Sequence, residues 1–191
     1  MRHSKTKGNL EKRYIGITDE HLCTEGITLA KSKVFPKVQK VYVSPLCRCI
    51  ETAKIIYKDL ELTIYEELRE CNFGEFENKN YIELSNNENY QKWIDSNGTL
   101  PFPGGEDIKM FKGRCVEAFN KVVDNMIEEN INTSALVVHG GTIMAILDNY
   151  SEDNRSYYDF QVKNCEGYII EIDKDLWTSG KKQIFIKEKM E

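Results

Sequence analysis

Arginine, histidine and carboxylate side chains occur at four points of the chain where a loop is expected. Arg2 and His3 open the sequence, Arg48 follows a Ser-Pro pair, Glu70 lies in a polar stretch, and His139 precedes two glycines. In open α/β sheets, ligands bind beyond the carboxyl ends of the strands, so loops of this kind face a common site. The sequence therefore indicates one site with two guanidiniums, two imidazoles and a carboxyl group.

This combination of side chains is suited to the transfer of a phosphoryl group. Two guanidiniums offer forked donors that stay charged and match the oxygen atoms of a phosphate. A neutral imidazole is a competent nucleophile toward phosphorus. A carboxylic acid protonates a leaving oxygen and later activates water as a base. The positive charge that other phosphatases take from metal ions is supplied in such a site by the protein.

Each of these residues also has an ordinary structural interpretation. A histidine near a chain end is often poorly ordered, and most arginines and glutamates lie in solvent. A histidine before two glycines also fits a plain turn at the end of a strand. The functional interpretation is favoured because all of these residues fall at junctions of one fold pattern.

Apolar periodicity predicts the elements that position these side chains. Helices are expected over 22–34, 46–57, 108–127 and 142–147, with a pair of short helices within 80–96. Strands are expected over 41–43, 62–65, 135–138, 168–172 and 184–186, and loops over 69–78 and 97–105. This alternation predicts an α/β fold, a three-layer sandwich with a mostly parallel central sheet flanked by helices.

Two helix starts are expected at particular residues. Thr24 is the expected N-cap of the first long helix, because threonine there precedes the first apolar repeat. Glu106 is expected to cap the helix that starts near Asp107, since a carboxylate is favourable at a helix N-terminus. Both expectations concern local structure and leave the predicted site unchanged.

Length and composition bound the class of protein. The 191 residues, of which 40% are hydrophobic, fit a single globular domain over 1–191, and residues 75–105 are expected to form a small cap or lid. The net charge of −5 argues against general nucleic-acid binding. No apolar run approaches the roughly 20 residues of a membrane span, and the first residues lack the apolar core of a signal peptide. The expected compartment is the cytoplasm.

The cysteines and histidines do not suggest a metal centre. Six scattered cysteines show no CxxC pair and are expected to stay reduced in the cytosol. Three separated histidines make no metal site by themselves. We therefore expect neither a metal ion nor a cofactor, and we expect the partner to be a small phosphorylated metabolite.

Five sequence blocks follow one another in a fixed order. They are RHSKTKGN (2–9), SPLCRCIETA (44–53), LRECNFG (68–74), PFPGGE (101–106) and VVHGG (137–141). In this order the chain resembles the histidine phosphatase superfamily, in its phosphoglycerate-mutase-like branch. The resemblance extends over nearly the whole chain, to about residue 172.

The resemblance implies a role for each matching residue. His3 resembles the nucleophile that becomes phosphorylated, and Glu70 resembles the general acid. His139 resembles the second pocket histidine, which donates to the phosphoryl oxygens. The remaining matches, to phosphate-binding positions, are Arg2, Arg48 and Asn9.

The chain departs from the family pattern in two places that matter. Ser4 stands where the signature has glycine, which removes easy access to positive φ. The family also places a hydrophobic strand directly before Arg-His, whereas this sequence begins at Met1. Without that strand, its neighbours keep unpaired backbone groups. We expect the natural start to lie several residues upstream, the alternative being a chain that folds poorly.

Three functions remain open at this stage. The first is a phosphomonoesterase; among short bacterial members the α-ribazole phosphatases of cobalamin assembly are similar in block order, which makes α-ribazole 5′-phosphate a candidate substrate. The second is a cofactor-dependent phosphoglycerate mutase, which is disfavoured because only 21 residues separate Arg48 from Glu70. The third is a non-catalytic module that binds a phosphorylated ligand, which is disfavoured because the whole set of site residues is present.

Overall fold

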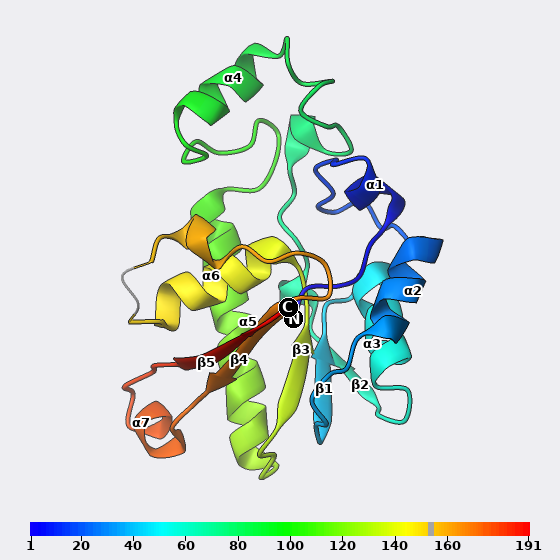
Figure 1. Cartoon of the computed structure of the whole chain (residues 1–191). Coiled ribbons are helices and arrows are strands. Elements are labelled where there is room, and N and C mark those ends of the chain that lie inside the picture. Colours follow the sequence, from blue (N-terminus) through cyan, green and yellow to red (C-terminus); the bar gives the residue numbers. More distant parts are fainter. Residues whose placement is uncertain (153–154) are drawn as a thin grey trace.

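Helices and strands alternate along the chain in the computed structural model, which describes residues 1–152 and 155–191 (Figure 1). The helices are α1 (Lys7–Leu10), α2 (Thr24–Ser32), α3 (Cys47–Ile56), α4 (Glu88–Asp95), α5 (Ile108–Glu128), α6 (Gly140–Tyr150) and α7 (Lys174–Thr178). The strands are β1 (Lys40–Val43), β2 (Leu62–Ile64), β3 (Ser134–Val137), β4 (Gly167–Glu171) and β5 (Phe185–Met190). Short 3₁₀ helices cover Glu66–Leu68, Gly74–Phe76 and Tyr157–Phe160. The predicted α/β class is confirmed.

Three parallel strands in the order β2-β1-β3 form the central sheet. Val41, Val43 and Val137 are fully buried in it, as β-branched residues of a sheet covered on both faces are. Figure 1 shows α2 and α3 on one side of this sheet and α5 and α6 on the other. The three-layer arrangement is therefore confirmed, and β1 and β3 end at the same edge of the sheet.

Helix α5 has the periodicity that the sequence indicates. Its buried residues recur at three- and four-residue spacings and face the core. The expected cap is wrong, because Asp107 and not Glu106 accepts hydrogen bonds from the backbone N–H groups of Lys109 and Met110. Glu106 instead pairs with Arg114 at 2.7 Å. A side chain at the N-cap position reaches the second and third N–H groups of the helix, which the residue before it does not.

Three other boundaries differ from the expectation. Helix α2 has Cys23 as its N-cap, without a side-chain cap bond, and Thr24 is its first helical residue. Only one helix, α4, forms within 80–96, since residues 81–86 are turns. Helix α6 begins at Gly140, two residues before the predicted start. Glycine lowers helix propensity, yet at a helix start it allows close packing.

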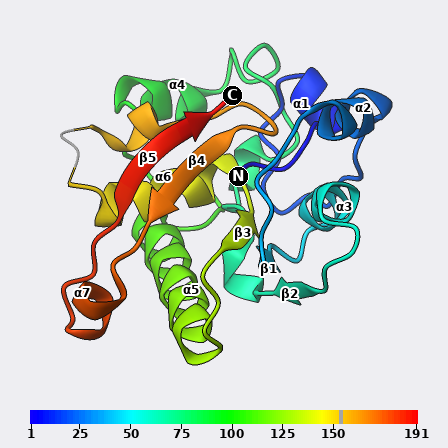
Figure 2. The same ribbon diagram turned by 60° about the horizontal axis from the view of Figure 1, so that its bottom comes forward.

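The last two strands do not belong to the parallel sheet. Strands β4 and β5 pair antiparallel with each other and form a separate two-stranded sheet. The segment 1–3 joins the two sheets, because Arg2 bridges Val138 in parallel orientation. The Arg2 backbone also donates to Glu166 O at 2.8 Å and accepts from Cys165 N at 3.1 Å. Figure 2 shows the N-terminus in this position, between β3 and β4.

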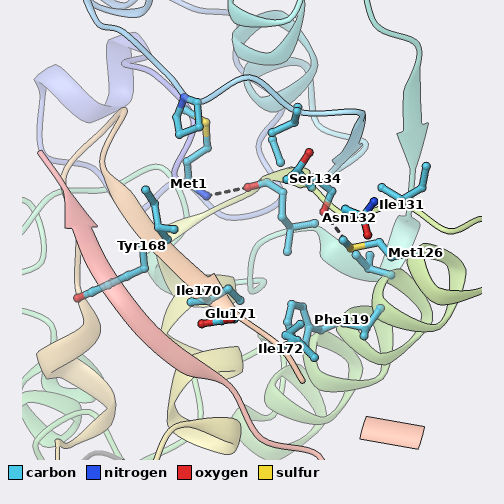
Figure 3. A pocket seen from close by; sticks show the side chains of 18 of the residues that line it. Met1, Phe119, Met126, Ile131, Asn132, Ser134, Tyr168, Ile170, Glu171 and Ile172 are labelled. Atoms are coloured by element: carbon cyan, nitrogen blue, oxygen red, sulfur yellow. Dashed lines mark hydrogen bonds between the residues drawn. The ribbon is translucent and has the colours of Figure 1, made fainter. Parts of the chain in front are cut away.

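Below Met1 the edges of β3 and β4 face each other across a cavity of about 560 Å³ (Figure 3). Its lining is mostly apolar and includes Phe119, Met126, Tyr168, Ile170 and Ile172. Within the described residues no strand lies between β3 and β4.

The amino group of Met1 lies at the mouth of this cavity. It donates to Leu136 O at 2.7 Å, as an amide in a parallel ladder does. Burial lowers the pKa of this group to about 6, so its charged form is disfavoured there. A peptide nitrogen at this position would make the same hydrogen bond without the cost of a buried charge.

Extending the chain ahead of Met1 should therefore raise its stability when the added residues form an apolar strand. We expect Val-Ile-Val-Val, behind a new initiator methionine, to raise the melting temperature by at least about 5 °C. The matched control is Gly-Ser-Gly-Ser of equal length. Differential scanning calorimetry of both variants decides the point, and equal melting temperatures would show that the cavity does not accept a strand.

Three remaining features of the described chain bear on the predictions about cysteines, membrane spans and the segment 75–105. All six cysteines carry free thiols, as expected. Among the helices of the described chain, none combines the length and apolar character needed to cross a bilayer. In the segment 75–105, Phe76 packs against Tyr90, Trp93 and Phe102, and Figure 1 shows α4 beyond the edge of the sheet at which β1 and β3 end.

Candidate active site

The structure brings five of the six predicted site residues to the carboxyl edge of the sheet. His3 follows the bridge with β3, Arg48 lies in the first turn of α3, and His139 is the N-cap of α6. The rings of His3 and His139 have centroids 5.2 Å apart. Gly141 at the start of α6 donates its backbone N–H to Glu70 Oε2 at 3.1 Å. Arg2 packs against Gly140, where an added Cβ would lie 3.7 Å from its Nε.

His3 is held as a neutral imidazole with one nitrogen free. Its Nδ1 lies 2.7 Å from Ser4 O, and because a carbonyl oxygen only accepts, Nδ1 carries the proton. Burial, with the positive charges of Arg48 and Arg2, lowers the pKa of His3 well below its usual value. The side chain is only 3% exposed. The lone pair of Nε2 is therefore available to attack an electrophile.

His139 is fully buried beside His3. Its Nε2 lies 2.7 Å from the Ser44 hydroxyl, at the end of β1. Burial lowers the pKa of His139 well below its usual value, and Arg48, His3 and Arg2 lower it further. A hydroxyl both donates and accepts, so Ser44 can hold either neutral tautomer of this ring.

Two guanidiniums at the site are held by carbonyl oxygens. Arg48 is fully buried, and donates from Nη1 to Thr18 O and from Nη2 to Gly16 O, both at 2.7 Å. Arg2 donates from Nη1 to Val162 O at 2.9 Å. The Nε atoms of both arginines are buried and have no partner among the described residues. Buried cationic donors without partners are costly, so they favour binding of an anion.

Glu70 is 7% exposed and keeps its proton more readily than a free carboxyl group. Its Oε1 accepts from Cys71 N at 3.0 Å and its Oε2 accepts from Gly141 N at 3.1 Å. Burial raises the pKa of Glu70, and this outweighs the lowering by these two N–H groups and by the arginines. A carboxyl group with a raised pKa is suited to act as a general acid.

Asn9 takes a different position from the other five residues. Its side-chain oxygen accepts from Thr6 N at 3.1 Å, as part of a capping box at the start of α1. The same oxygen accepts from Asn164 Nδ2 at 3.1 Å, and Asn164 also donates to His3 O at 3.0 Å. Asn9 therefore contacts the backbone that carries His3 through Asn164, and its contact with a phosphate stays a prediction.

Ser4 fits the loop without the conformation that glycine allows. It is absent from the residues with positive φ. Its hydroxyl donates to Gly26 O at 2.6 Å, and its N–H donates to Thr52 Oγ1 at 2.9 Å. The serine therefore ties the turn after His3 to α2 and α3, and the departure from the family signature distorts nothing.

Sequence reasoning missed some of the residues that shape the site. Ser44 lies in a recognised block, and only its contact with His139 was unforeseen. Thr52 also lies in that block, at a helical spacing of four from Arg48, whose carbonyl accepts from its hydroxyl at 2.6 Å. Asn164 lies in an irregular loop before β4, and no periodicity or motif marks it. Across residues 1–152 and 155–191, no cluster of metal-ligating side chains is present.

Comparison with known proteins agrees with this geometry. The family model of the histidine phosphatase superfamily (branch 1) matches residues 1–183. A Hydrogenobacter thermophilus protein named as a candidate phosphoserine phosphatase is 30% identical over 155 residues, covering 77% of this chain and 74% of its own. Phosphoglycerate mutase-like protein 4 of Arabidopsis thaliana is 29% identical over 190 residues, covering 93% and 80%.

A solved structure has the same fold. The α-ribazole phosphatase of Shigella flexneri superposes with a TM-score of 0.83 at 21% identity, covering 100% of this chain and 94% of that one. The chain belongs to the histidine phosphatase superfamily, and it is a phosphatase of this class. The family predicted from the five sequence blocks is confirmed.

Proposed function

We propose that this chain is a metal-independent phosphomonoesterase that hydrolyses a small phosphorylated metabolite through a phosphohistidine at His3. The observation that carries the proposal is a neutral imidazole beside two guanidiniums whose buried Nε atoms have no partner among the described residues. A phosphoryl group between them supplies the anion that these donors lack. The same charges stabilise the phosphoryl oxygens as the bond to the leaving group breaks.

In the first step Nε2 of His3 attacks the phosphorus atom. A nitrogen–phosphorus bond forms while the bond from phosphorus to the ester oxygen breaks. Glu70, whose pKa is raised by burial, gives its proton to that oxygen and becomes a carboxylate. Arg2, Arg48 and His139 hold the phosphoryl oxygens during the transfer.

In the second step a water molecule attacks phosphohistidine. The Glu70 carboxylate takes a proton from this water, so the residue returns to its acid form. The nitrogen–phosphorus bond breaks, inorganic phosphate leaves and His3 regains its free Nε2. The backbone carbonyl of Ser4 keeps Nδ1 protonated and the ring oriented throughout.

The substrate class is a small phosphate monoester, with α-ribazole 5′-phosphate as one candidate. Support comes from the shared fold with the Shigella α-ribazole phosphatase. The Hydrogenobacter relative makes phosphoserine a second candidate to include in any screen. The net charge of −5 fits a small ligand held by a few buried cations better than a nucleic acid.

Turnover should be independent of added metal ions. We expect the chain to release phosphate from at least one of α-ribazole 5′-phosphate, phosphoserine and 3-phosphoglycerate, with kcat/KM unchanged by EDTA. The arginines and His139 supply the positive charge, so a chelator removes nothing that the reaction needs. Loss of activity in EDTA that Mg²⁺ or Zn²⁺ restores would contradict this mechanism. Isomerisation of 3-phosphoglycerate without phosphate release would instead favour a mutase.

The acid role of Glu70 has a distinct signature in the first step. Alkoxide leaving groups need a proton and nitrophenolate needs it far less. In single-turnover measurements Glu70→Gln should slow transfer from an alkyl phosphate at least about tenfold more than from a nitrophenyl phosphate. With the wild-type chain, transfer from the alkyl ester should fall as the pH rises through the raised pKa of Glu70, because the acid form is lost.

The matched control is Glu67→Gln, a neighbouring glutamate whose carboxylate pairs with Lys121 at 2.8 Å on the surface. It should leave both substrates unaffected. Equal losses for both esters in Glu70→Gln would mean that this residue only braces its loop.

A further inference from the structure

Glu77, outside the residues discussed so far, holds the loop that supports Arg48. Its Oε1 accepts from Gly16 N at 2.8 Å, from Thr18 N at 2.9 Å and from the Thr18 hydroxyl at 2.7 Å. Its Oε2 accepts from Phe73 N at 3.1 Å. One carboxylate therefore satisfies four donors from two segments, residues 16–18 and the turn after Glu70. Hydrogen bonds to a charged acceptor are the stronger kind.

Two of the three residues that donate to Glu77, Gly16 and Thr18, also hold Arg48. Gly16 and Thr18 each direct the N–H to Glu77 and the carbonyl oxygen to the guanidinium of Arg48, at 2.7 Å in both cases. Arg48 is fully buried and forms no ion pair with a carboxylate among the described residues. Its orientation therefore depends on these carbonyl oxygens, and the position of the carbonyls depends on Glu77.

The packing around Gly16 also restricts the position of this loop. Gly16 is packed so closely that an added Cβ would lie 1.9 Å from Cys71 O. A small shift of the loop therefore meets a backbone atom on one side. A shift in the opposite direction breaks the two hydrogen bonds that Arg48 donates to Gly16 O and Thr18 O. The three hydrogen bonds from Gly16 and Thr18 to the Glu77 carboxylate add to these constraints on the loop.

We infer that Glu77 is a positioning residue for the phosphate clamp, acting on Arg48 through the backbone of Gly16 and Thr18. This inference rests on the proposed function, because Arg48 matters only if it binds the phosphoryl group. It also links the segment 75–105, in which Glu77 lies, to the residues that hold the phosphate clamp. Glu77 itself does not touch the reacting atoms.

The experiment measures phosphate binding and turnover in Glu77→Ala and Glu77→Gln. Glu77→Ala should raise the inhibition constant of inorganic phosphate and lower kcat/KM, each by at least about tenfold. Glu77→Gln keeps one acceptor oxygen and should lose less. Glu75→Gln is the matched control, since Glu75 lies on the same turn, is exposed, and contacts Asn89 Nδ2 at 3.1 Å. It should behave as the wild type does.

A double-mutant cycle with Arg48→Lys separates positioning from general stability. Lysine keeps the charge and loses the fork, so Arg48→Lys should itself be strongly impaired. If Glu77 acts through Arg48, Glu77→Ala should cost less than about twofold in the Arg48→Lys background. The same tenfold loss in both backgrounds would overturn the inference. So would a drop in melting temperature with unchanged phosphate affinity, which is the mark of a purely structural role.

The outcomes distinguish the two proposals. If Glu77→Ala fails to fold, the same cycle is measured with Glu77→Gln, whose smaller loss should also vanish beside Arg48→Lys. Near-normal turnover by Arg48→Lys would remove Arg48 from the clamp, and the role of Glu77 would fall while the phosphomonoesterase activity itself would stand. Impaired Arg48→Lys with an additive effect of Glu77→Ala would overturn only the inference about Glu77.

Discussion

Two guanidiniums whose buried Nε atoms have no partner among the described residues set the electrostatics of this site. Arg48 is held by the carbonyl oxygens of Gly16 and Thr18, and Arg2 by that of Val162. Burial and these cations together keep both histidines neutral. The two arginines also lower the pKa of Glu70, but burial has the larger effect, so the pKa of Glu70 is raised. An imidazole without a proton on Nε2 and a carboxyl group with a raised pKa result from one arrangement of charge.

This arrangement needs a rigid support because charged donors in a low-dielectric site are costly when misplaced. The support is the edge of the parallel sheet, where β1 and β3 end and segment 1–3 bridges β3 to β4. Helix α6 starts at this edge and presents Gly141 N to Glu70. The cavity of Figure 3 lies below this bridge. Segment 1–3, which includes His3, forms its backbone hydrogen bonds above the cavity, where the two sheets come together.

The sequence was informative where chemistry and periodicity act locally. Arg48 and His139 stand directly after apolar strands, so the sheet edge places them together. The buried face of α5 follows from the spacing of its apolar residues alone. Other features depend on contacts between distant segments. The antiparallel pairing of β4 with β5 in a separate sheet is one such feature, which no local pattern encodes. No motif or spacing in the sequence marks Glu77, and only the folded loop shows four donors aimed at it.

The most direct test of the account is whether His3 becomes phosphorylated during turnover. The chain is mixed with an excess of a phosphate ester, quenched in alkali within milliseconds, and analysed by mass spectrometry after proteolysis. The account predicts one phosphoryl group on the peptide that contains His3, stable in alkali and lost in acid, as nitrogen–phosphorus bonds are. A phosphoryl group on another residue would contradict it. So would full turnover with no phosphorylated chain at any quench time.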